Sequence, residues 1–100
     1  MDGFPALVRE RVYALYGDRL VELVLFGSRA RGDHRPGSDW DFAVRLRPLL
    51  DRSRDEEALA RLPLEIFEST GEWVQFVVQE AGNERPGLLR AAIRMEGRTV

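Results

Sequence analysis

Asp39 and Asp41 are separated by one residue, in a stretch where apolar and polar side chains alternate. Residues two apart on a β-strand point to the same face, with Cα atoms about 6.5–7 Å apart, so the two carboxylates can share divalent cations. Ligands that are all oxygen favour Mg²⁺ or Mn²⁺, which keep some waters and recruit substrate phosphates. The pair therefore indicates a site for metal and phosphate, although an isolated pair of aspartates is more often a turn former or a solvated surface group.

The dipeptide Gly27-Ser28 ends a short apolar run and lies ten residues before Asp39. A strand that leads into such a turn and then a short helical segment leaves backbone N–H groups and a hydroxyl where an anion can dock. Gly27 has no side chain to keep a phosphate away. Taken alone, Ser28 would be read as an ordinary cap of segment 29–32. Beside two aspartates, the turn predicts a phosphate-binding position.

Three arginines, Arg29, Arg31 and Arg35, surround this turn. Their charges suit a triphosphate or a leaving pyrophosphate, and some of them are expected to be ordinary surface residues. His34 is the only histidine and lies in a polar loop. A single histidine without nearby partners is usually just exposed, so we assign it no ligand role.

Two strands must position these groups. The mostly apolar run Leu20–Phe26 predicts a buried strand that leads into the turn. From Asp39 onward the alternation predicts a second strand with one apolar and one chemically equipped face. The first face carries Trp40, Phe42, Val44 and Leu46, and the second carries Asp39, Asp41, Ala43 and Arg45. Both carboxylates are thereby committed to one polar face.

The rest of the chain predicts helices and a third strand. Helical spacing and capping signals predict three helices. The first covers Pro5–Tyr16, and the second begins at a capping box, Ser53-Arg-Asp-Glu56, and continues through a stripe of Leu59, Leu62 and Ile66 that Pro63 kinks or splits. The third begins after Arg85-Pro-Gly and buries Leu88, Leu89, Ala92 and Ile93. The run Glu72–Gln79 predicts a strand whose apolar face is Val74, Phe76 and Val78. Gln75 therefore lies on the opposite face, and Glu72 and Glu80 have the other parity.

Composition excludes several classes of protein. The chain has 100 residues, enough for one core, so we expect a single domain over residues 1–100. Its net charge of −2 argues against general nucleic-acid binding. All 15 cationic side chains are arginine, and there is no cysteine, charged leader or long apolar run. We expect a cytoplasmic protein that does not enter membranes.

Gly27-Ser28, ten residues and then Asp39-Trp-Asp41 resemble the GS-x10-DxD signature of the polymerase-β-type nucleotidyltransferase superfamily. GSRARG followed by SDxD resembles its minimal nucleotidyltransferase branch. The late V-x-F-V-V strand and the segment from Leu88 to Arg98 also resemble that branch, so the similarity covers nearly the whole chain.

The resemblance implies an α/β (α+β) fold, a small mixed sheet backed by helices like the polymerase-β palm. It implies transfer of a nucleoside monophosphate and release of pyrophosphate, with ATP as the favoured donor and AMP as the group transferred. Asp39 and Asp41 would be the catalytic metal ligands for Mg²⁺ or Mn²⁺. Gly27, Ser28, Arg29 and Arg31 would bind the nucleotide. Paired metals of this type stabilise both the attacking and the leaving oxygen.

One position departs from the family pattern. The third carboxylate of the family comes from the later strand, and the matching residue here is Gln75. Glutamine is neutral and is a poor general base or Mg²⁺ ligand. Gln75 is therefore an uncertain third site residue.

Members of this branch are often paired with a helical HEPN-type toxin, which implies such a protein as partner and NTP as substrate. The first hypothesis is an Mg²⁺-dependent enzyme that transfers AMP to the partner, as the antitoxin of a toxin–antitoxin pair. The second is a weakly active or inactive nucleotidyltransferase-fold module that binds and neutralises the partner. The third hypothesis is transfer to a small molecule such as an aminoglycoside, and it is less favoured because the chain has no room for a domain that would bind such an acceptor.

Overall fold

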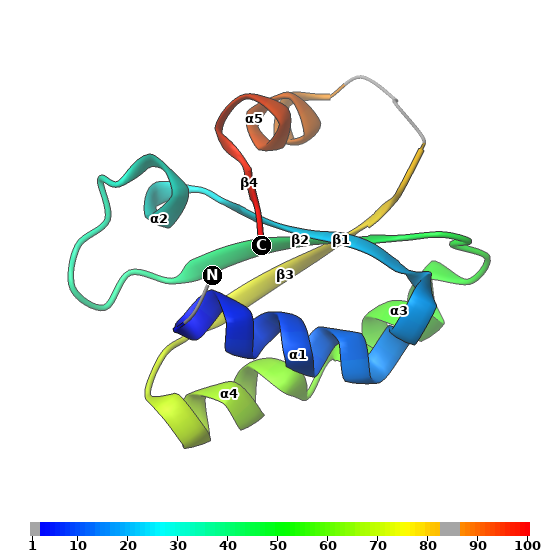
Figure 1. Cartoon of the computed structure of the whole chain (residues 1–100), viewed down its shortest axis with the longest axis horizontal. Helices are drawn as coiled ribbons and strands as arrows, with labels where there is room; N and C mark the ends of the chain where they lie inside the picture. The colour runs from blue at the N-terminus through cyan, green and yellow to red at the C-terminus, as the bar shows by residue number, and fades with distance from the viewer. Residues whose placement is uncertain (1–2, 83–86) are drawn as a thin grey trace.

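The alternating stretch after Asp39 forms strand β2 (Trp40–Leu46), which lies inside a four-stranded mixed sheet of order β3-β2-β1-β4 (Figure 1). β1 pairs antiparallel with β2 and β4, and β2 pairs parallel with β3. This computed structural model describes residues 3–82 and 87–100. Its other elements are α1 (Phe4–Tyr16), η1 (Gly17–Arg19), β1 (Leu20–Phe26), α2 (Ser28–Arg31), α3 (Arg52–Leu59), α4 (Leu62–Thr70), β3 (Val74–Glu80), α5 (Leu88–Glu96) and β4 (Arg98–Thr99). The predicted α+β architecture is confirmed.

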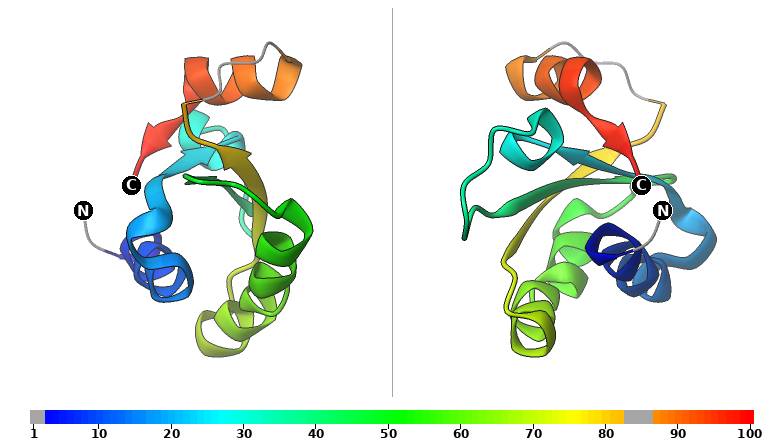
Figure 2. Two further views of the ribbon diagram at one scale, coloured as in Figure 1. Left: turned by 90° about the vertical axis from the view of Figure 1, so that its right-hand side faces the viewer. Right: turned by 60° about the vertical axis from the view of Figure 1, so that its left-hand side comes forward.

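Helices α1, α3 and α4 cover one face of the sheet and α5 lies over the other (Figure 2). The main core fills the first interface, where the predicted apolar face of β2 meets the helices. Its largest fully buried side chains are Phe42, Leu23, Leu46, Ile66, Val8, Val12 and Val44. The parallel pairing of β2 with β3 requires a long crossover, and α3 and α4 supply it. This layer fixes which way each strand faces.

A smaller core on the opposite face corrects the expectation for β2. Ala43 is fully buried there with Val24 and Ile93, beneath α5. The face of β2 that was predicted to carry the functional side chains is therefore covered by α5 in its middle. It stays accessible at the end of β2 that carries Asp41, which is half-buried, with Asp39 just before the strand. The periodicity of β2 could not reveal that α5 lands on Ala43.

The helix boundaries follow local chemistry. α3 ends at Leu59 and α4 begins at Leu62 with Pro63 in its first turn, so the predicted split is confirmed; proline is tolerated there because first-turn N–H groups have no helical acceptor. The capping box predicted at Ser53–Glu56 is wrong. Asp51 caps α3 by accepting from the Arg54 N–H at 3.1 Å. A cap needs a non-helical backbone, which Asp51 has and Ser53, already inside α3, lacks.

The last helix is described from Leu88, after Gly87. Of the predicted start at Arg85-Pro-Gly, Arg85 and Pro86 lie outside the described residues, as do the side chains of Leu88, Leu89 and Ala92. Ile93 is buried as expected. No helix among the described residues is long and apolar enough to cross a membrane.

Two arginines tie the crossover to the sheet. On β3, the carbonyl of Val78 accepts a hydrogen bond from the Arg52 guanidinium of α3. Arg19 of η1 binds Asp55 of α3 with both Nη atoms, at 3.0 and 2.6 Å. The backbone carbonyl of Asp55 also accepts from the Tyr16 hydroxyl at 2.6 Å, and burial, ahead of the Asp55 charge, raises the pKa of Tyr16 to about 12.

The Arg19–Asp55 pair makes a testable contribution to stability. Hydrogen bonding from Arg19 holds the pKa of Asp55 below its usual value, so the ionised carboxylate stabilises the fold above the unfolded pKa of about 3.9. That contribution is lost as pH falls through the folded pKa. Asp55→Asn should cost about 1–2 kcal/mol at pH 7, a value reduced because Arg19 is 38% exposed.

Urea unfolding of wild type and Asp55→Asn between pH 7 and pH 3 measures this difference. We expect the gap to close as the pH falls. A gap that stays constant with pH would assign the loss to packing and not to charge. Asp33→Asn is the control, because Asp33 pairs with Arg31 at the exposed surface, where ion pairs contribute about 0–1 kcal/mol.

Candidate functional site

The two aspartates lie at one end of the sheet, on the face that α5 partly covers. Asp41 belongs to β2 and pairs with Phe26, the last residue of β1. Asp39 comes directly before β2, and both residues have the parity of Ala43, which faces α5. The prediction that the carboxylates share one polar face agrees with this geometry.

The Gly27-Ser28 turn lies directly against Asp41. Gly27 adopts φ 79° and ψ −159°, a region essentially restricted to glycine. A Cβ built on Gly27 would collide with Asp41 Oδ2. Only a residue without a side chain lets the carboxylate and the turn approach this closely. β1 and β2 thus bring the predicted phosphate-binding turn and the predicted metal ligand together.

Gln75 joins the same site from the neighbouring strand. The parallel register places Gln75 beside Asp41, and its side-chain Nε2 donates to Asp39 Oδ2 at 2.7 Å. The predicted orientation of Gln75 toward the aspartates is confirmed. The amide is a donor to Asp39, so it fixes the orientation of that carboxylate and adds no negative charge.

The two aspartates place negative charge close together in a half-buried position. Burial first, and then the nearby Asp39 charge, raise the pKa of Asp41, while Arg31 opposes the shift. Two neighbouring carboxylates that repel each other in a half-buried place are stabilised by a bound cation. Within residues 3–82 and 87–100 no group of three or more acidic or histidine side chains gathers as a metal site. A two-carboxylate oxygen set fits Mg²⁺, which takes waters and phosphate oxygens as its remaining ligands.

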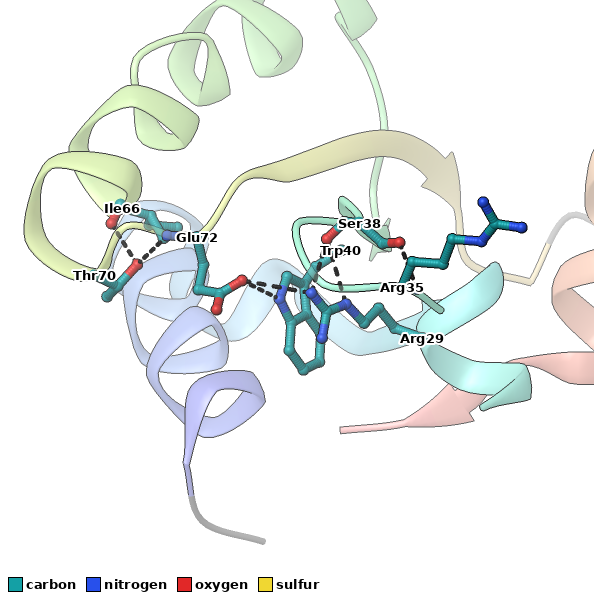
Figure 3. Close-up of polar contacts among 7 residues, drawn as sticks. All are labelled: Arg29, Arg35, Ser38, Trp40, Ile66, Thr70 and Glu72. Carbon is teal, nitrogen blue, oxygen red and sulfur yellow. Dashed lines mark hydrogen bonds and ion pairs between the residues drawn. The ribbon is translucent and has the colours of Figure 1, made fainter. Parts of the chain in front are cut away.

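The arginines do not act as one group. Arg31 binds Asp33 at 3.1 Å and Glu96 of α5 at 3.1 Å. The Arg29 guanidinium lies 4.4 Å from the centre of the Trp40 ring, on the side of β2 opposite the aspartates. Arg35 is exposed, and its side chain points away from Trp40 (Figure 3). His34 is exposed as well.

The chain matches the family model described as a nucleotidyltransferase domain over residues 6–94. It belongs to the nucleotidyltransferase domain family. The match includes the Gly27-Ser28 turn and both aspartates. No curated protein gives a significant match.

Solved structures share the fold of this nucleotidyltransferase domain. One is a crystal structure of a toxin–antitoxin with AMP-PNP, with a TM-score of 0.69 and 20% identity over 96% of this chain and 72% of that chain. Another is the toxin–antitoxin MntA-HpeT with two aspartates changed to glutamate, with a TM-score of 0.66 and 18% identity over 93% and 69%. A third, MntA-HpeT with a tyrosine changed to alanine, has a TM-score of 0.64 and 18% identity over 97% and 71%.

Sequence reasoning did not anticipate the contacts of two acidic residues near the candidate site. Glu96 binds Arg31, and Glu72 binds the indole of Trp40.

The separation of Arg29 from Arg31 could have been predicted from the sequence. Residues two apart on a helix do not face the same way, so Arg29 and Arg31 could not both point toward the aspartates.

Proposed function

We propose that the protein is an Mg²⁺-dependent nucleotidyltransferase that transfers AMP from ATP to a protein partner. The observation that carries the proposal is the contact between the Gly27 turn and Asp41, with Asp39 held beside it by Gln75. In this proposal, the N–H groups of the turn bind phosphate next to two carboxylates that hold the metal, and the short distance between Gly27 and Asp41 supports it. Transfer to a protein is supported by the toxin–antitoxin neighbours of the same fold, one of which was crystallised with AMP-PNP.

Each residue has a defined task in this proposal. Asp39 and Asp41 hold Mg²⁺ or Mn²⁺, which when bound neutralises phosphate charge and activates the attacking oxygen. The Gly27-Ser28 turn binds the triphosphate through backbone N–H groups, and Arg31, whose charge acts on Asp41, adds positive charge. The acceptor hydroxyl forms a bond to the α-phosphorus, the bond to the bridging oxygen breaks, and pyrophosphate leaves. Gln75 cannot take the hydroxyl proton, so that proton goes to solvent or to the partner.

The proposed partner is a helical HEPN-type toxin, and the protein would act as its antitoxin in the cytoplasm. The second candidate is a module that binds the partner with weak or no turnover. It is favoured by one observation: Gln75 occupies the place of a third carboxylate and donates to Asp39. Both candidates share the fold and the partner, and they differ in whether a covalent product forms.

Label transfer distinguishes the two. With the co-purified partner, Mg²⁺ and ATP labelled at the α-phosphate, we expect label on the partner and pyrophosphate in solution. ATP labelled at the γ-phosphate should leave the partner unlabelled. A tight complex with no transfer under Mg²⁺ or Mn²⁺ would favour the binding module.

Gln75→Asp adds a sharper arm to the same experiment. The change supplies a base and a negative charge, so it should increase the rate of pyrophosphate release. A positioned general base typically contributes about 10²–10⁴-fold to a reaction rate. It also puts a carboxylate beside Asp39, so the metal-free variant should unfold at a lower temperature and regain stability with Mg²⁺. Gln75→Asn, which shortens the side chain equally and stays neutral, is the matched control. An unchanged rate in folded Gln75→Asp would remove Gln75 from the chemistry.

A further inference from the structure

Arg29, Trp40 and Glu72 form a cluster (Figure 3). Trp40 packs against the main core, so this cluster lies on the face of β2 opposite the two aspartates. The Arg29 guanidinium stacks on the Trp40 ring at 4.4 Å and lies 3.7 Å from Glu72 Oε2. The same carboxylate oxygen accepts from Trp40 Nε1 at 2.9 Å. Only 12% of the Arg29 side chain is exposed. Each member of this cluster therefore has a defined position.

Arg29 also binds the backbone that leads into the site. Its Nε and Nη2 atoms donate to the carbonyl oxygen of Ser38 at 3.3 and 2.9 Å. That carbonyl belongs to the peptide bond between Ser38 and Asp39. Arg29 immediately follows the Gly27-Ser28 turn, so one side chain connects the turn with the first aspartate.

This connection matters because Asp39 lies outside the sheet. β2 begins at Trp40, and its pairing with β1 reaches only to Asp41. The ladder with β3 begins at the pair Trp40 and Val74. The peptide after Asp39 is still held, because the Trp40 N–H donates to the Trp73 carbonyl at 2.9 Å. The peptide before Asp39 lies beyond the paired residues of β2, and the bond from Arg29 to the Ser38 carbonyl restrains it.

The far end of the cluster is anchored on α4. The Glu72 N–H donates to the Thr70 hydroxyl at 3.1 Å, and this hydroxyl donates to the Ile66 carbonyl at 2.7 Å (Figure 3). The Trp40 ring also packs against Phe4 of α1, with centroids 4.8 Å apart. The cluster thus connects the loop before Asp39, through hydrogen bonds and packing, to helices α4 and α1.

We infer that Arg29 is a positioning residue, which holds Asp39 at a fixed place relative to the Gly27-Ser28 turn and does not itself bind phosphate. This inference rests on the proposed function, because it assigns Arg29 a task in the same metal and nucleotide site. Arginine suits the task because its planar fork can bind one carbonyl and stack on an indole together. Lysine keeps the charge and loses both geometries.

The test compares Arg29→Gln, Arg29→Lys and the exposed control Arg9→Gln. Calorimetry measures the affinity for a non-hydrolysable ATP analogue with Mg²⁺ and with EDTA. Loss of a residue that orients a metal ligand typically costs about 10–100-fold in metal affinity. We expect that loss in the Mg²⁺-dependent part alone, for glutamine and lysine alike. A phosphate ligand would instead lose affinity equally in EDTA, and lysine would restore much of it; that result would overturn the inference.

Hydrogen exchange of the amides between residues 33 and 41 provides a readout that does not need nucleotide. We expect exchange there to become faster in both Arg29 variants by a larger factor than in the slow amides of β1, which report global stability, and to stay unchanged in Arg9→Gln. If wild type binds no nucleotide, the proposed function fails, and exchange alone decides the role of Arg29. Exchange of this segment at the wild-type rate in Arg29→Gln would overturn the inference.

Discussion

Asp39→Asn and Asp41→Asn are each expected to abolish Mg²⁺-dependent nucleotide binding and to leave the fold intact. Both carboxylates lie on the accessible end of the α5 face, so neither supports the main core. Asparagine keeps the shape of the side chain and removes the charge that a hard cation requires. Calorimetry with ATP and Mg²⁺ measures the effect, and Asp18→Asn, exposed on η1, is the control. Equal affinity in wild type and the double variant would eliminate this site.

Asp41→Asn carries an additional expectation for stability. Its burial and the Asp39 charge raise the pKa of Asp41, so folding favours the protonated form. The stability from that form is fully present below the unfolded pKa, about 3.9, and is lost as pH rises through the folded pKa. At pH 7 the ionised side chain is therefore a cost that asparagine removes. Without metal, thermal unfolding should show the variant at least as stable as wild type, with the difference shrinking below about pH 4.

Gly27→Ala is expected to have the second large effect, because one methyl group disturbs both halves of the site. The backbone region at φ 79° and ψ −159° costs about 1–3 kcal/mol for other residues. The methyl group would also collide with Asp41 Oδ2, so the carboxylate must move. We expect lower stability and, in the folded fraction, a loss of Mg²⁺-dependent nucleotide affinity of at least about tenfold, since 1.4 kcal/mol is a factor of ten.

Gly71→Ala separates strain from chemistry. Gly71 caps α4 at φ 79° and ψ 3°, and a Cβ there would meet nothing within 4 Å. It should lose about 1–2 kcal/mol of stability from left-handed strain and bind nucleotide as wild type does. If Gly27→Ala binds nucleotide equally well, the close approach of Gly27 and Asp41 has no role in binding.

The strands were predictable because each has one side that the core must cover. Strand β1 over Leu20–Phe26 and the inward face of β2 follow from apolar runs and alternation, which burial enforces. The orientation of Gln75 followed from the same parity. Strand β4 over Arg98–Thr99 was not predicted, since two exposed residues carry no periodic signal. The start of α3 was placed too late, since Asp51 and Ser53 are both good caps and only the backbone conformation distinguishes them.

The positions of the two aspartates in the candidate site were predictable from the sequence, and the positions of the arginines were less so. Carboxylates on a strand inherit their direction from the alternation, which placed Asp39 and Asp41 together. A long arginine on a four-residue helix has no such constraint, so the sequence did not indicate that Arg29 turns toward Trp40. The parity of Glu72 placed it on the side of the sheet where Trp40 lies, but parity gives a side and not a partner, so the bond from Trp40 to Glu72 was equally hidden.

The strand order leaves β3 and β4 at the edges of the sheet. An edge strand offers unpaired backbone groups to other chains and invites aggregation. β3 has seven residues and three valines, which makes it the better template for such pairing. Arg52 occupies the carbonyl of Val78 and places a charge beside it, while β4 is only two residues long. The two edges therefore offer little to a pairing strand for different reasons: on β3 the Arg52 charge lies beside an occupied carbonyl, and β4 is too short.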